Sequence, residues 1–377
     1  MRAHSGPRTV PATYMRGGTS KGVFLRGRDL PPPGPERDRI ILDIMGSPDP
    51  LQIDGLGGTY SSTSKVVLVD PGDGDDDIRY EFAQVGVDTV EVDWAGNCGN
   101  LTTAVGVYAI EEGLVAAVEP VTSLLLRNVN TGVAIRAEVP VRNGHPLVQG
   151  DHAVAGVPGT GAPIATHYLD PGGGVCGREL PTGRAHDTVE TADGAFPVSI
   201  VDVTHPYAFV AAKDIGLALF EHSVAELNAD QALVGRLNLL RDGCAGLIAR
   251  SGWAGEPSPT VPRLVLVGPA QAPPPGLPEG EADFAALALS MGAIHRALPM
   301  TGALCAAAAA RIPGTIPSAV ARSGSGGAVR ILHPRGVVSV LVDLYEPPGP
   351  RLVRSVGVVR TARVLMSGLV HLHPESP

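Results

Sequence analysis

Short apolar runs bounded by glycine and proline recur along the chain, and they predict a framework rich in β-strands. Val, Leu, Ile and Ala dominate these runs, and few of them continue long enough for a helix. The segments that we expect to form strands are 65–69, 78–85, 123–127, 133–139, 198–203, 208–211, 264–267, 328–332 and 336–340.

Helical patterns are fewer, and two of them begin at similar points in the two halves of the chain. One strand-rich stretch surrounds a helix that starts near Cys98, and a second surrounds a helix that starts near Thr301. We therefore expect a duplicated α+β plan, although no repeat of the sequence itself is readable. The segments expected to be helical are 38–45, 101–112, 223–228, 230–240, 281–290 and 302–311.

The length of the chain, 377 residues, exceeds what one ordinary hydrophobic core holds, so two domains are expected. We assign them to residues 1–185 and 186–377. The segment 141–197 is dense in glycine and proline, but apolar residues such as Tyr168 and Leu180 recur along it. That spacing indicates an ordered, turn-rich connection rather than a disordered linker.

Composition excludes several classes of function. Hydrophobic residues make up 44% of the chain and its net charge is −9, with no cluster of basic residues that would suit a nucleic-acid partner. No apolar run reaches the length of a membrane span, and the N-terminal residues lack the apolar region of a signal peptide. The four cysteines lie far apart without CxxC spacing, which argues against a zinc site or a disulfide framework. A cytoplasmic location is expected.

Cys98 occupies an unusual position, between two Gly/Asn pairs where a helix is expected to begin. In WAGNCGNLTTAVG (94–106), the turn formers Asn97, Gly99 and Asn100 precede a small apolar run. The start of a helix has unpaired amide groups and the positive end of the helix dipole, which attract anions and lower the pKa of a thiol. The alternative is a small buried cysteine, the commonest fate of a free thiol.

Two further segments combine glycine with hydroxyls and cations. MRGGTSKG (15–22) is predicted to be a loop suited to gripping a carboxylate, unless it is only a charged surface turn. In GLGGTYSSTSKVVLVD (55–70), Lys65 lies at the mouth of an apolar strand. If it is partly buried, desolvation lowers its pKa and makes it a usable acid or base; otherwise it is a lysine at a strand edge that reaches solvent.

The other cysteines and the histidines are weaker candidates for a catalytic or binding role. Cys305 is expected inside the second helix on its Ala-rich packing surface, and Cys176 and Cys244 have no polar companions, so all three are predicted to be structural. His295, just before the second helix, either contacts an anion or caps the turn. We expect no metal site, since no set of ligands has suitable spacing, and GLGG lacks the pattern of a nucleotide fingerprint.

Taken together, ten short motifs in order along almost the whole chain resemble those of the PrpF family, whose members isomerise unsaturated tricarboxylates. Such a resemblance implies two similar domains with the fold of diaminopimelate epimerase, each a curled, mostly antiparallel sheet around a central helix, with the active site in the cleft between them. The motifs are MRGGTSKG (15–22), SSTSKV (61–66), GNCGN (96–100), NTG (130–132), VPGTGAPI (157–164), LDPGGGVCGRELPTG (169–183), VSIVDVTHP (198–206), HRA (295–297), TGALC (301–305) and HPRGVV (333–338).

The resemblance also implies a division of roles at the two helix entrances. Racemases of this fold carry a cysteine at each entrance, and CGNLT (98–102) is similar to the first, whereas Pro299 stands where the second cysteine would be. A racemase with two cysteines is therefore disfavoured. The PrpF pattern pairs Cys98 with Lys65 as the catalytic residues of an allylic proton shift that needs no cofactor. The residues expected to hold the substrate carboxylates are Arg16, Thr19, Ser20, Lys21, Gly99, Asn100, His295, Thr301 and Gly302.

The resemblance leaves the substrate open among unsaturated di- and tricarboxylates. We favour 2-methylaconitate or a close analogue, with 4-oxalomesaconate tautomerisation and methylitaconate double-bond migration as alternatives. An amino-acid epimerase is a further enzymatic alternative, and a carboxylate-binding accessory protein is the non-enzymatic one. The expected partner is the small carboxylate substrate, without nucleic acid or membrane, and the oligomeric state is open between a monomer and a homodimer or larger homo-oligomer.

Overall fold

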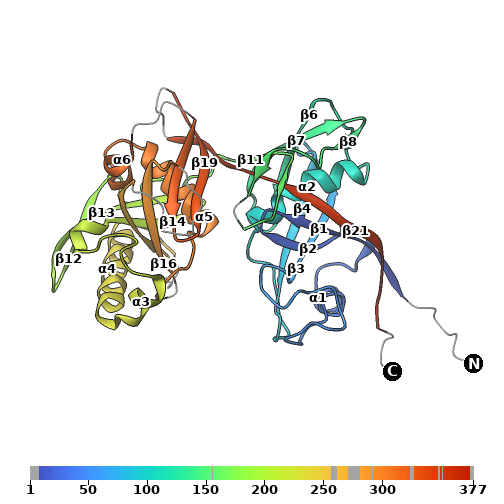
Figure 1. Ribbon diagram of the computed structural model, residues 1–377, viewed down its shortest axis with the longest axis horizontal. Helices are drawn as coiled ribbons and strands as arrows, with labels where there is room; N and C mark the ends of the chain where they lie inside the picture. The colour runs from blue at the N-terminus through green and yellow to red at the C-terminus, as the bar shows by residue number, and fades with distance from the viewer. Residues whose placement is uncertain are drawn as a thin grey trace, which may run out of the picture. The chain divides into compact units, whose positions relative to one another are not determined.

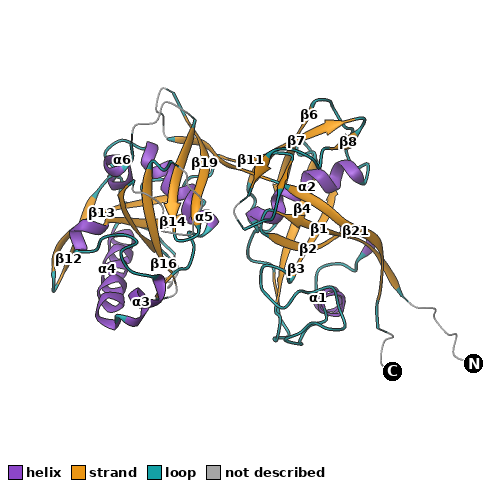
Figure 2. Cartoon of the chain, in the orientation of Figure 1, coloured by secondary structure: helices purple, strands orange, loops and turns teal. Residues whose placement is uncertain are grey.

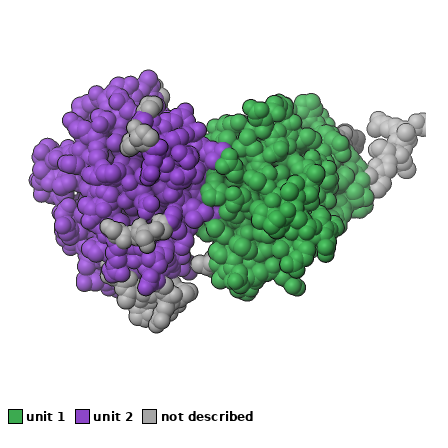
Figure 3. Space-filling model, turned by 90° about the horizontal axis from the view of Figure 1, so that it is seen from above, with its two compact units in different colours: residues 1–167, 359–377 green, residues 168–358 purple. Residues whose placement is uncertain are grey.

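The structure is a computed structural model that describes residues 8–154, 156–255, 261–270, 281–290, 292–322, 327–346, 349 and 351–373. The chain forms two compact units, shown in different colours in Figure 3. Unit 1 contains the chain up to His167 and again from Val359, and unit 2 is Tyr168–Val358. The units therefore differ from the expected division at residue 185, both in the position of that boundary and in the return of the C-terminal strand to unit 1.

Two sets of contacts explain these boundaries. The buried carboxylate of Asp202 accepts hydrogen bonds from the backbone amides of Val175 (2.9 Å) and Cys176 (2.6 Å), which holds the glycine-rich segment around them in unit 2. At the other end, strand β21 (Ala362–His371) pairs antiparallel with β1 (Thr9–Gly17) along most of its length. Backbone pairing between the two ends of the chain cannot be read from the composition of either segment.

Unit 1 is a mixed sheet that curls around helix α2 (Gly99–Glu111). The strands lie in the order β21, β1, β2, β3, β4, β6, β7; β2 runs parallel to β3 and β4 parallel to β6, while the other neighbours are antiparallel. Every residue of α2 from Leu101 to Ile110 is buried, as expected for a helix enclosed by a sheet. The further bounds are β2 Ser20–Leu25, β3 Lys65–Pro71, β4 Ile78–Val85, β6 Val121–Asn128 and β7 Ala134–Arg142.

Unit 2 repeats this plan around helix α5 (Met300–Arg311). Its strands lie in the order β12, β13, β14, β15, β16, β18, β19, β20, and again two neighbouring pairs, β14 with β15 and β16 with β18, are parallel. The strand bounds are β12 Asp187–Thr191, β13 Gly194–Val203, β14 His205–Ala211, β15 Arg263–Pro269, β16 Phe284–Ser290, β18 Ala328–His333, β19 Gly336–Leu344 and β20 Val353–Arg360. The expected duplicated α+β plan is thus present (Figure 1).

Outer helices cover the remaining faces. In unit 1, α1 (Pro35–Met45) packs Ile40, Ile41 and Ile44 into one core with residues of β2 and β3. In unit 2, α4 (Gln231–Arg250) takes the corresponding place against β12–β16. Strands predominate in both units (Figure 2). Short elements complete the fold: η1 Gly27–Asp29, β5 Val92–Asp93, β8 His145–Pro146, β9 His152–Ala153, β10 Thr160–Gly161, β11 Ile164–Leu169, η2 Ala212–Ile215, α3 Val224–Ala229, β17 Ala293–Ile294 and α6 Ile316–Val320.

Two predicted elements are wrong. The segment 281–290 does not form a helix, because residues Phe284–Ser290 are strand β16, which lies between β15 and β18. Its alanine and leucine content favours a helix intrinsically, but burial inside the sheet overrides that preference. The predicted loop at 15–22 is a β-hairpin, in which Gly17 pairs with Ser20 across a two-residue turn.

In the part of the chain that the structure describes, no helix has the length and apolar character that crossing a membrane requires.

Substitution of Gly106 in α2 tests how closely the central helix packs against its sheet. A Cβ atom there would lie 2.9 Å from Val139 Cγ2 and 3.3 Å from Leu124 Cδ1, both on strands that enclose the helix. We expect Gly106→Val to destabilise the protein by about 1–3 kcal/mol through overpacking, measured by urea unfolding. Gly235→Ala in the exposed face of α4 is the control, since nothing lies near its added Cβ and a gain of about 0.5–1 kcal/mol is expected. Equal stability of Gly106→Val and the wild type would contradict the close packing.

Candidate active site

Helix α2 begins directly after Cys98, and a network of polar side chains holds this entrance in place. Cys98 is the N-cap residue, with extended backbone angles, and Thr102 donates its backbone N–H to the Cys98 carbonyl at 2.9 Å. Tyr80 in β4 donates to Asn97 Oδ1 (3.1 Å), and its oxygen lies 3.0 Å from Thr102 Oγ1. No side chain among the described residues caps the helix, so the amides of the first turn face outward from its end.

The turn between β1 and β2 lies directly against this helix entrance. A Cβ atom on Gly17 would lie 2.3 Å from the Asn100 carbonyl oxygen, and one on Gly18 would lie 2.2 Å from Asn100 Oδ1. Gly18 also has φ +49°, a left-handed conformation that favours glycine. The glycine pair of MRGGTSKG therefore permits a contact that any other residue would prevent.

Hydroxyl groups of the same turn reach both Asn100 and Cys98. Asn100 Nδ2 donates to Thr19 Oγ1 at 3.0 Å and lies 3.4 Å from Ser20 Oγ. Ser20 Oγ is also 3.9 Å from the Cys98 sulfur, within contact range for a thiol. Five predicted site residues thus gather at one end of α2: Thr19, Ser20, Cys98, Gly99 and Asn100.

Lys65 lies beside this group, at the start of β3. Strands β2 and β3 run parallel with Val23 opposite Val66, so Lys65 is next to Gly22, two residues beyond Ser20. The Lys65 side chain is buried, at 7% exposure, and its Nζ lies 5.1 Å from the centre of the Phe82 ring. Burial lowers the pKa of the Lys65 amine because the charged form loses hydration, and the nearby Cys98 acts in the opposite direction. The structure therefore brings the two predicted catalytic residues together.

Gln84 is a polar neighbour of Lys65 that sequence reasoning missed. It lies opposite Lys65 in the antiparallel β3–β4 pair, and its Oε1 accepts a hydrogen bond from Lys65 Nζ. Its Nε2 donates to the backbone oxygens of Ser61 (3.0 Å) and Ser64 (2.9 Å). The available signal was the register of two correctly predicted strands, but nothing in their sequences defined that register.

Arg16 and Lys21, predicted to hold carboxylates, have other contacts. Arg16 Nη1 donates to the Gly18 and Thr361 carbonyls, at 3.0 and 2.8 Å, and Nη2 donates to Thr361 Oγ1 at 3.0 Å. These bonds tie the hairpin turn to the start of β21. The Lys21 ammonium lies 5.4 Å from the centre of the Tyr14 ring, on the neighbouring strand β1. Their contact with substrate stays a prediction.

In unit 2 the corresponding entrance is that of α5, where Pro299 is the N-cap residue. Thr301 Oγ1 lies 2.9 Å from Tyr207 Oη, and Arg263 Nη1 donates to that same Tyr207 oxygen at 3.2 Å. The ring of Tyr207 packs against Gly302, whose added Cβ would lie 3.1 Å from Cζ. His295 is exposed and its Nδ1 lies 2.9 Å from the Ala297 carbonyl oxygen. That these residues bind a carboxylate stays a prediction.

The four cysteines are free, and they differ sharply in surroundings. Cys305 and Cys244 are fully buried, and Cys305 Sγ lies 3.3 Å from the Val201 carbonyl oxygen. Burial raises the pKa of Cys244 and of Cys176 to about 12, and it raises the pKa of Cys305 as well. Cys98 is half-buried at the end of a helix. Within the described ranges, no group of three or more His, Cys, Asp or Glu side chains could hold a metal ion.

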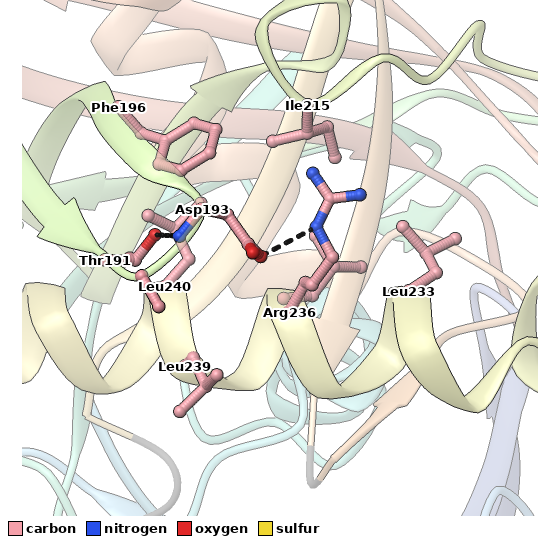
Figure 4. Close-up of a pocket in the computed structure, with 10 residues that line it drawn as sticks. Thr191, Asp193, Phe196, Ile215, Leu233, Arg236, Leu239 and Leu240 are labelled. Atoms are coloured by element: carbon pink, nitrogen blue, oxygen red, sulfur yellow. Dashed lines mark hydrogen bonds and ion pairs between the residues drawn. The ribbon is translucent and has the colours of Figure 1, made fainter.

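A separate pocket of unit 2 lies between α4 and the β12–β13 hairpin (Figure 4). Its walls are mostly apolar, with Phe196, Leu233 and Leu240 among them, and an ion pair of 3.1 Å joins Asp193 to Arg236 at its rim. None of the predicted site residues lines this pocket. Apart from that ion pair, its lining has no charged side chain that could act as an acid or a base, so the α2 entrance is the better candidate for the active site.

The chemistry available at the α2 entrance follows from these contacts. A buried amine with a lowered pKa is able to accept a proton, and a thiol close to it is able to donate one. Uncapped amides at the helix end and the hydroxyls of Thr19 and Ser20 favour a bound anion. Together they suit the movement of a proton on a carboxylate-bearing molecule.

Comparison with known proteins gives relatives along nearly the full chain. The chain is 39% identical to the 3-methylitaconate isomerase of Eubacterium barkeri, with 96% of this chain and 97% of that protein covered. It is 37% identical to the 2-methyl-aconitate isomerase of Shewanella oneidensis, covering 96% of each. Identity to the 4-oxalomesaconate tautomerase of Pseudomonas putida is also 37%, over 97% of this chain and 96% of that one.

Solved structures agree with the predicted fold. The crystal structure of methylitaconate-delta-isomerase superposes with a TM-score of 0.89 at 38% identity, covering 98% of this chain and 96% of that one. A probable proline racemase from Agrobacterium radiobacter, 15% identical with a TM-score of 0.50 over 98% and 94% of the two chains, shares the fold alone. The predicted epimerase-like fold class is thereby confirmed. Residues 8–373 match the family described as "PrpF protein", and the chain belongs to that family.

Proposed function

We propose that this protein is a cofactor-independent isomerase that moves a proton along an unsaturated di- or tricarboxylate, with Lys65 and Cys98 as the proton-transferring residues. The observation that carries the proposal is their common location: a buried amine on β3 and a thiol at the N-cap of α2, close enough for Cys98 to influence the pKa of Lys65. Relatives that are named as isomerases and match 96% of the chain support this class of reaction.

The proposed reaction has two proton transfers and no net change in composition. A base removes a proton from a carbon next to a C=C bond or alpha to a carboxylate, so the C–H electron pair spreads into an allylic carbanion. An acid then delivers a proton to another carbon of the allylic system, or to the same carbon after bond rotation. One C–H bond breaks and one forms, and Lys65 and Cys98 exchange their protonation states.

The anion formed during this reaction needs stabilisation, and the α2 entrance offers it. Negative charge spreads from the carbanion onto the attached carboxylate, which we propose lies against the amides of Gly99 and Asn100 and the hydroxyls of Thr19 and Ser20. Such preorganised donors are worth about 3–4 kcal/mol each in comparable sites. For unit 2 the proposal is that a carboxylate binds at the α5 entrance, near His295, Thr301 and Gly302.

The substrate that we favour is 2-methylaconitate or a close analogue. Methylitaconate and 4-oxalomesaconate share the same allylic or keto–enol proton chemistry, and relatives named for all three substrates are 37–39% identical to this chain. Identity therefore supports the substrate class without separating its members.

A racemase mechanism with two thiols fits the described residues less well. Such an enzyme needs one thiol on each face of the reacting carbon, and Pro299 holds the N-cap position of α5 where the second would stand. Cys305, the thiol of that helix, is fully buried and its raised pKa keeps it protonated at neutral pH. An accessory protein that binds a carboxylate without turnover remains the non-enzymatic alternative, and the first experiment below separates it from an enzyme.

The cellular compartment and the oligomeric state are also part of the proposal. Free cysteines throughout the chain support a reducing compartment, and we propose the cytoplasm. We keep the homodimer or homo-oligomer as an alternative to the monomer, which sedimentation of the purified protein distinguishes.

Proton exchange in D2O tests the proposed activity directly. The purified protein is incubated with 2-methylaconitate, methylitaconate and 4-oxalomesaconate separately, and NMR follows which C–H signal is lost and which isomer appears. We expect deuterium to enter the allylic position of at least one of them together with isomer formation. Binding by calorimetry without deuterium incorporation or isomer formation for any substrate would support the accessory protein instead.

Substitution of the two proposed catalytic residues separates turnover from binding. Lys65→Ala and Cys98→Ser should each lower turnover by about 10²–10⁴-fold, while affinity for the substrate falls much less, because the carboxylate contacts remain. The matched controls are Lys213→Ala, an exposed lysine, and Cys176→Ser, a thiol of unit 2. Normal turnover by folded Lys65→Ala would mean that the lysine is only a buried strand residue.

Thiol reactivity provides a test that needs no substrate. Only the thiolate reacts, so the raised pKa values of Cys176, Cys244 and Cys305 predict slow alkylation of all three below about pH 10. Cys98, half-buried at a helix N-terminus, should react first with iodoacetamide, followed by mass spectrometry of its peptide. Equally slow labelling of all four cysteines would contradict the proposed role of Cys98, and prior addition of substrate should protect Cys98 selectively.

A further inference from the structure

We propose that Gln84 is the positioning residue of Lys65: it holds the amine through a neutral acceptor, so that the lysine is fixed in place without being kept in its charged form. The consequence for turnover rests on the proposed function of Lys65, but the contact itself does not. Gln84 lies outside the ten motifs on which the family resemblance depends, and none of the expected roles includes it.

The surroundings of Gln84 determine which end of its amide faces Lys65. Both N–H groups of Nε2 are used, by the backbone oxygens of Ser61 at 3.0 Å and Ser64 at 2.9 Å. A flipped amide would bring Oε1 against two carbonyl oxygens and its NH2 group against the lysine amine, which also donates. Oε1 is therefore the atom that Lys65 Nζ meets, because a reversed amide would lose both bonds to the backbone and, with a charged amine, the bond from Lys65 as well.

The backbone that carries this contact is itself held firmly. Lys65 and Gln84 are directly opposite in the β3–β4 ladder, and Ser64 O also accepts the backbone N–H of Val85 at 3.1 Å. The ring of Phe82, two residues before Gln84, lies beside the lysine amine. A lysine side chain has four rotatable bonds, and the contacts with Gln84 and the Phe82 ring hold it in one arrangement next to the α2 entrance.

A neutral partner has a chemical advantage over a charged one. A carboxylate at the same point would favour the ammonium form and oppose the effect of burial, whereas an amide oxygen accepts a hydrogen bond without adding charge. Desolvation accordingly remains the largest influence on Lys65 and lowers its pKa. Both protonation states keep the contact, because a neutral amine and an ammonium each have an N–H to donate. The lone pair of the neutral amine then points away from Gln84 and is free to take a proton.

Two variants that differ in charge at one position test this assignment. Gln84→Glu and Gln84→Met both lose the bonds to Ser61 and Ser64, but only Gln84→Glu puts a negative charge beside Lys65. We expect the pKa of Lys65 to rise by about one unit or more in Gln84→Glu and to fall in Gln84→Met, where the ammonium loses its acceptor. If the substitutions acted only by releasing Ser61 and Ser64, the pKa of Lys65 would shift in the same direction in both variants, or in neither.

Competitive acetylation with acetic anhydride measures this without any substrate. The chain has three lysines, Lys21, Lys65 and Lys213, so the labelled peptides are easily resolved by mass spectrometry. At neutral pH, labelling of Lys65 should slow about tenfold in Gln84→Glu, as a pKa rise of about one unit implies, and accelerate in Gln84→Met, while Lys213 stays constant as the internal control. Gln52→Met is the matched loop control, because Gln52 Nε2 binds Ser64 Oγ at 2.8 Å and holds the same loop without touching Lys65. It should leave the Lys65 labelling profile unchanged.

Kinetics with an established substrate give a second readout. Both Gln84 variants should lower kcat far more than they raise KM. The limb of the kcat–pH profile that reports the titration of Lys65 should shift to higher pH in Gln84→Glu and to lower pH in Gln84→Met. If Lys65→Ala turns over normally, the proposed function fails while the labelling result still stands. If Lys65→Ala is inactive but the Gln84 variants keep the wild-type pH profile, only the assignment of Gln84 fails.

The wild-type protein supplies a test that no folding defect of a variant can obscure. The side-chain NH2 resonances of Gln84 should shift with pH at the same midpoint that acetylation gives for Lys65, since the amide is bonded to the titrating amine. Gln52, which is bonded to serine hydroxyls and a backbone amide, serves as the reference. Gln84 resonances that do not move with the titration of Lys65, or equal labelling of Lys65 in wild type and both Gln84 variants, would overturn the proposal.

Discussion

Burial of one amine, that of Lys65, is the constraint on which the candidate site depends. An ammonium group in a mostly apolar sheet loses hydration, and in this structure it meets a neutral amide and an aromatic ring rather than a carboxylate. Its charged form is thus disfavoured, as the proton-transfer role that we propose for Lys65 requires. The arrangement is tolerable because Gln84 gives the buried amine a hydrogen-bond acceptor.

The fold supplies the remaining parts by enclosing a helix in a sheet. Since α2 is buried from Leu101 to Ile110 and only half-buried at Gly99 and Asn100, its N-terminus emerges at one end of the sheet, where the β1–β2 turn and the start of β3 also lie. Gly17 and Gly18 let the turn approach the helix closely enough for Thr19 and Ser20 to contact Asn100 and Cys98. Unit 2 uses the same strand pattern around α5, but proline replaces cysteine at the N-cap, so the duplicated fold carries different chemistry at its two helix entrances.

Much of this could be predicted from the sequence, because it depends on local patterns. All of the predicted strands, and every predicted helix except 281–290, correspond to elements of the structure. The helix entrance at Cys98 was evident from turn formers followed by a small apolar run. The error at 281–290 arose because an Ala- and Leu-rich segment in the middle of a sheet has the composition of a helix.

What the sequence did not reveal depends on pairing between distant residues. Gln84 meets Lys65 only through the register of β3 and β4, and the apolar runs alone do not define that register. Thr361, which binds Arg16, reaches it only because β21 returns to pair with β1. Arg16 illustrates the limit well: a guanidinium in a glycine-rich motif predicts carboxylate binding, but its contacts with the Gly18 and Thr361 carbonyls could not be read from the motif.

The measurement that tests the central claim most directly is a titration of the lysine side chains by NMR. Protein labelled with 13C at lysine Cε should give one signal from each of its three lysines, and the spectrum of Lys65→Met assigns that of Lys65. We expect Lys65 to titrate at a lower pH than the exposed Lys213, because burial disfavours its ammonium form. A Lys65 signal that titrates together with Lys213, or at higher pH, would contradict it.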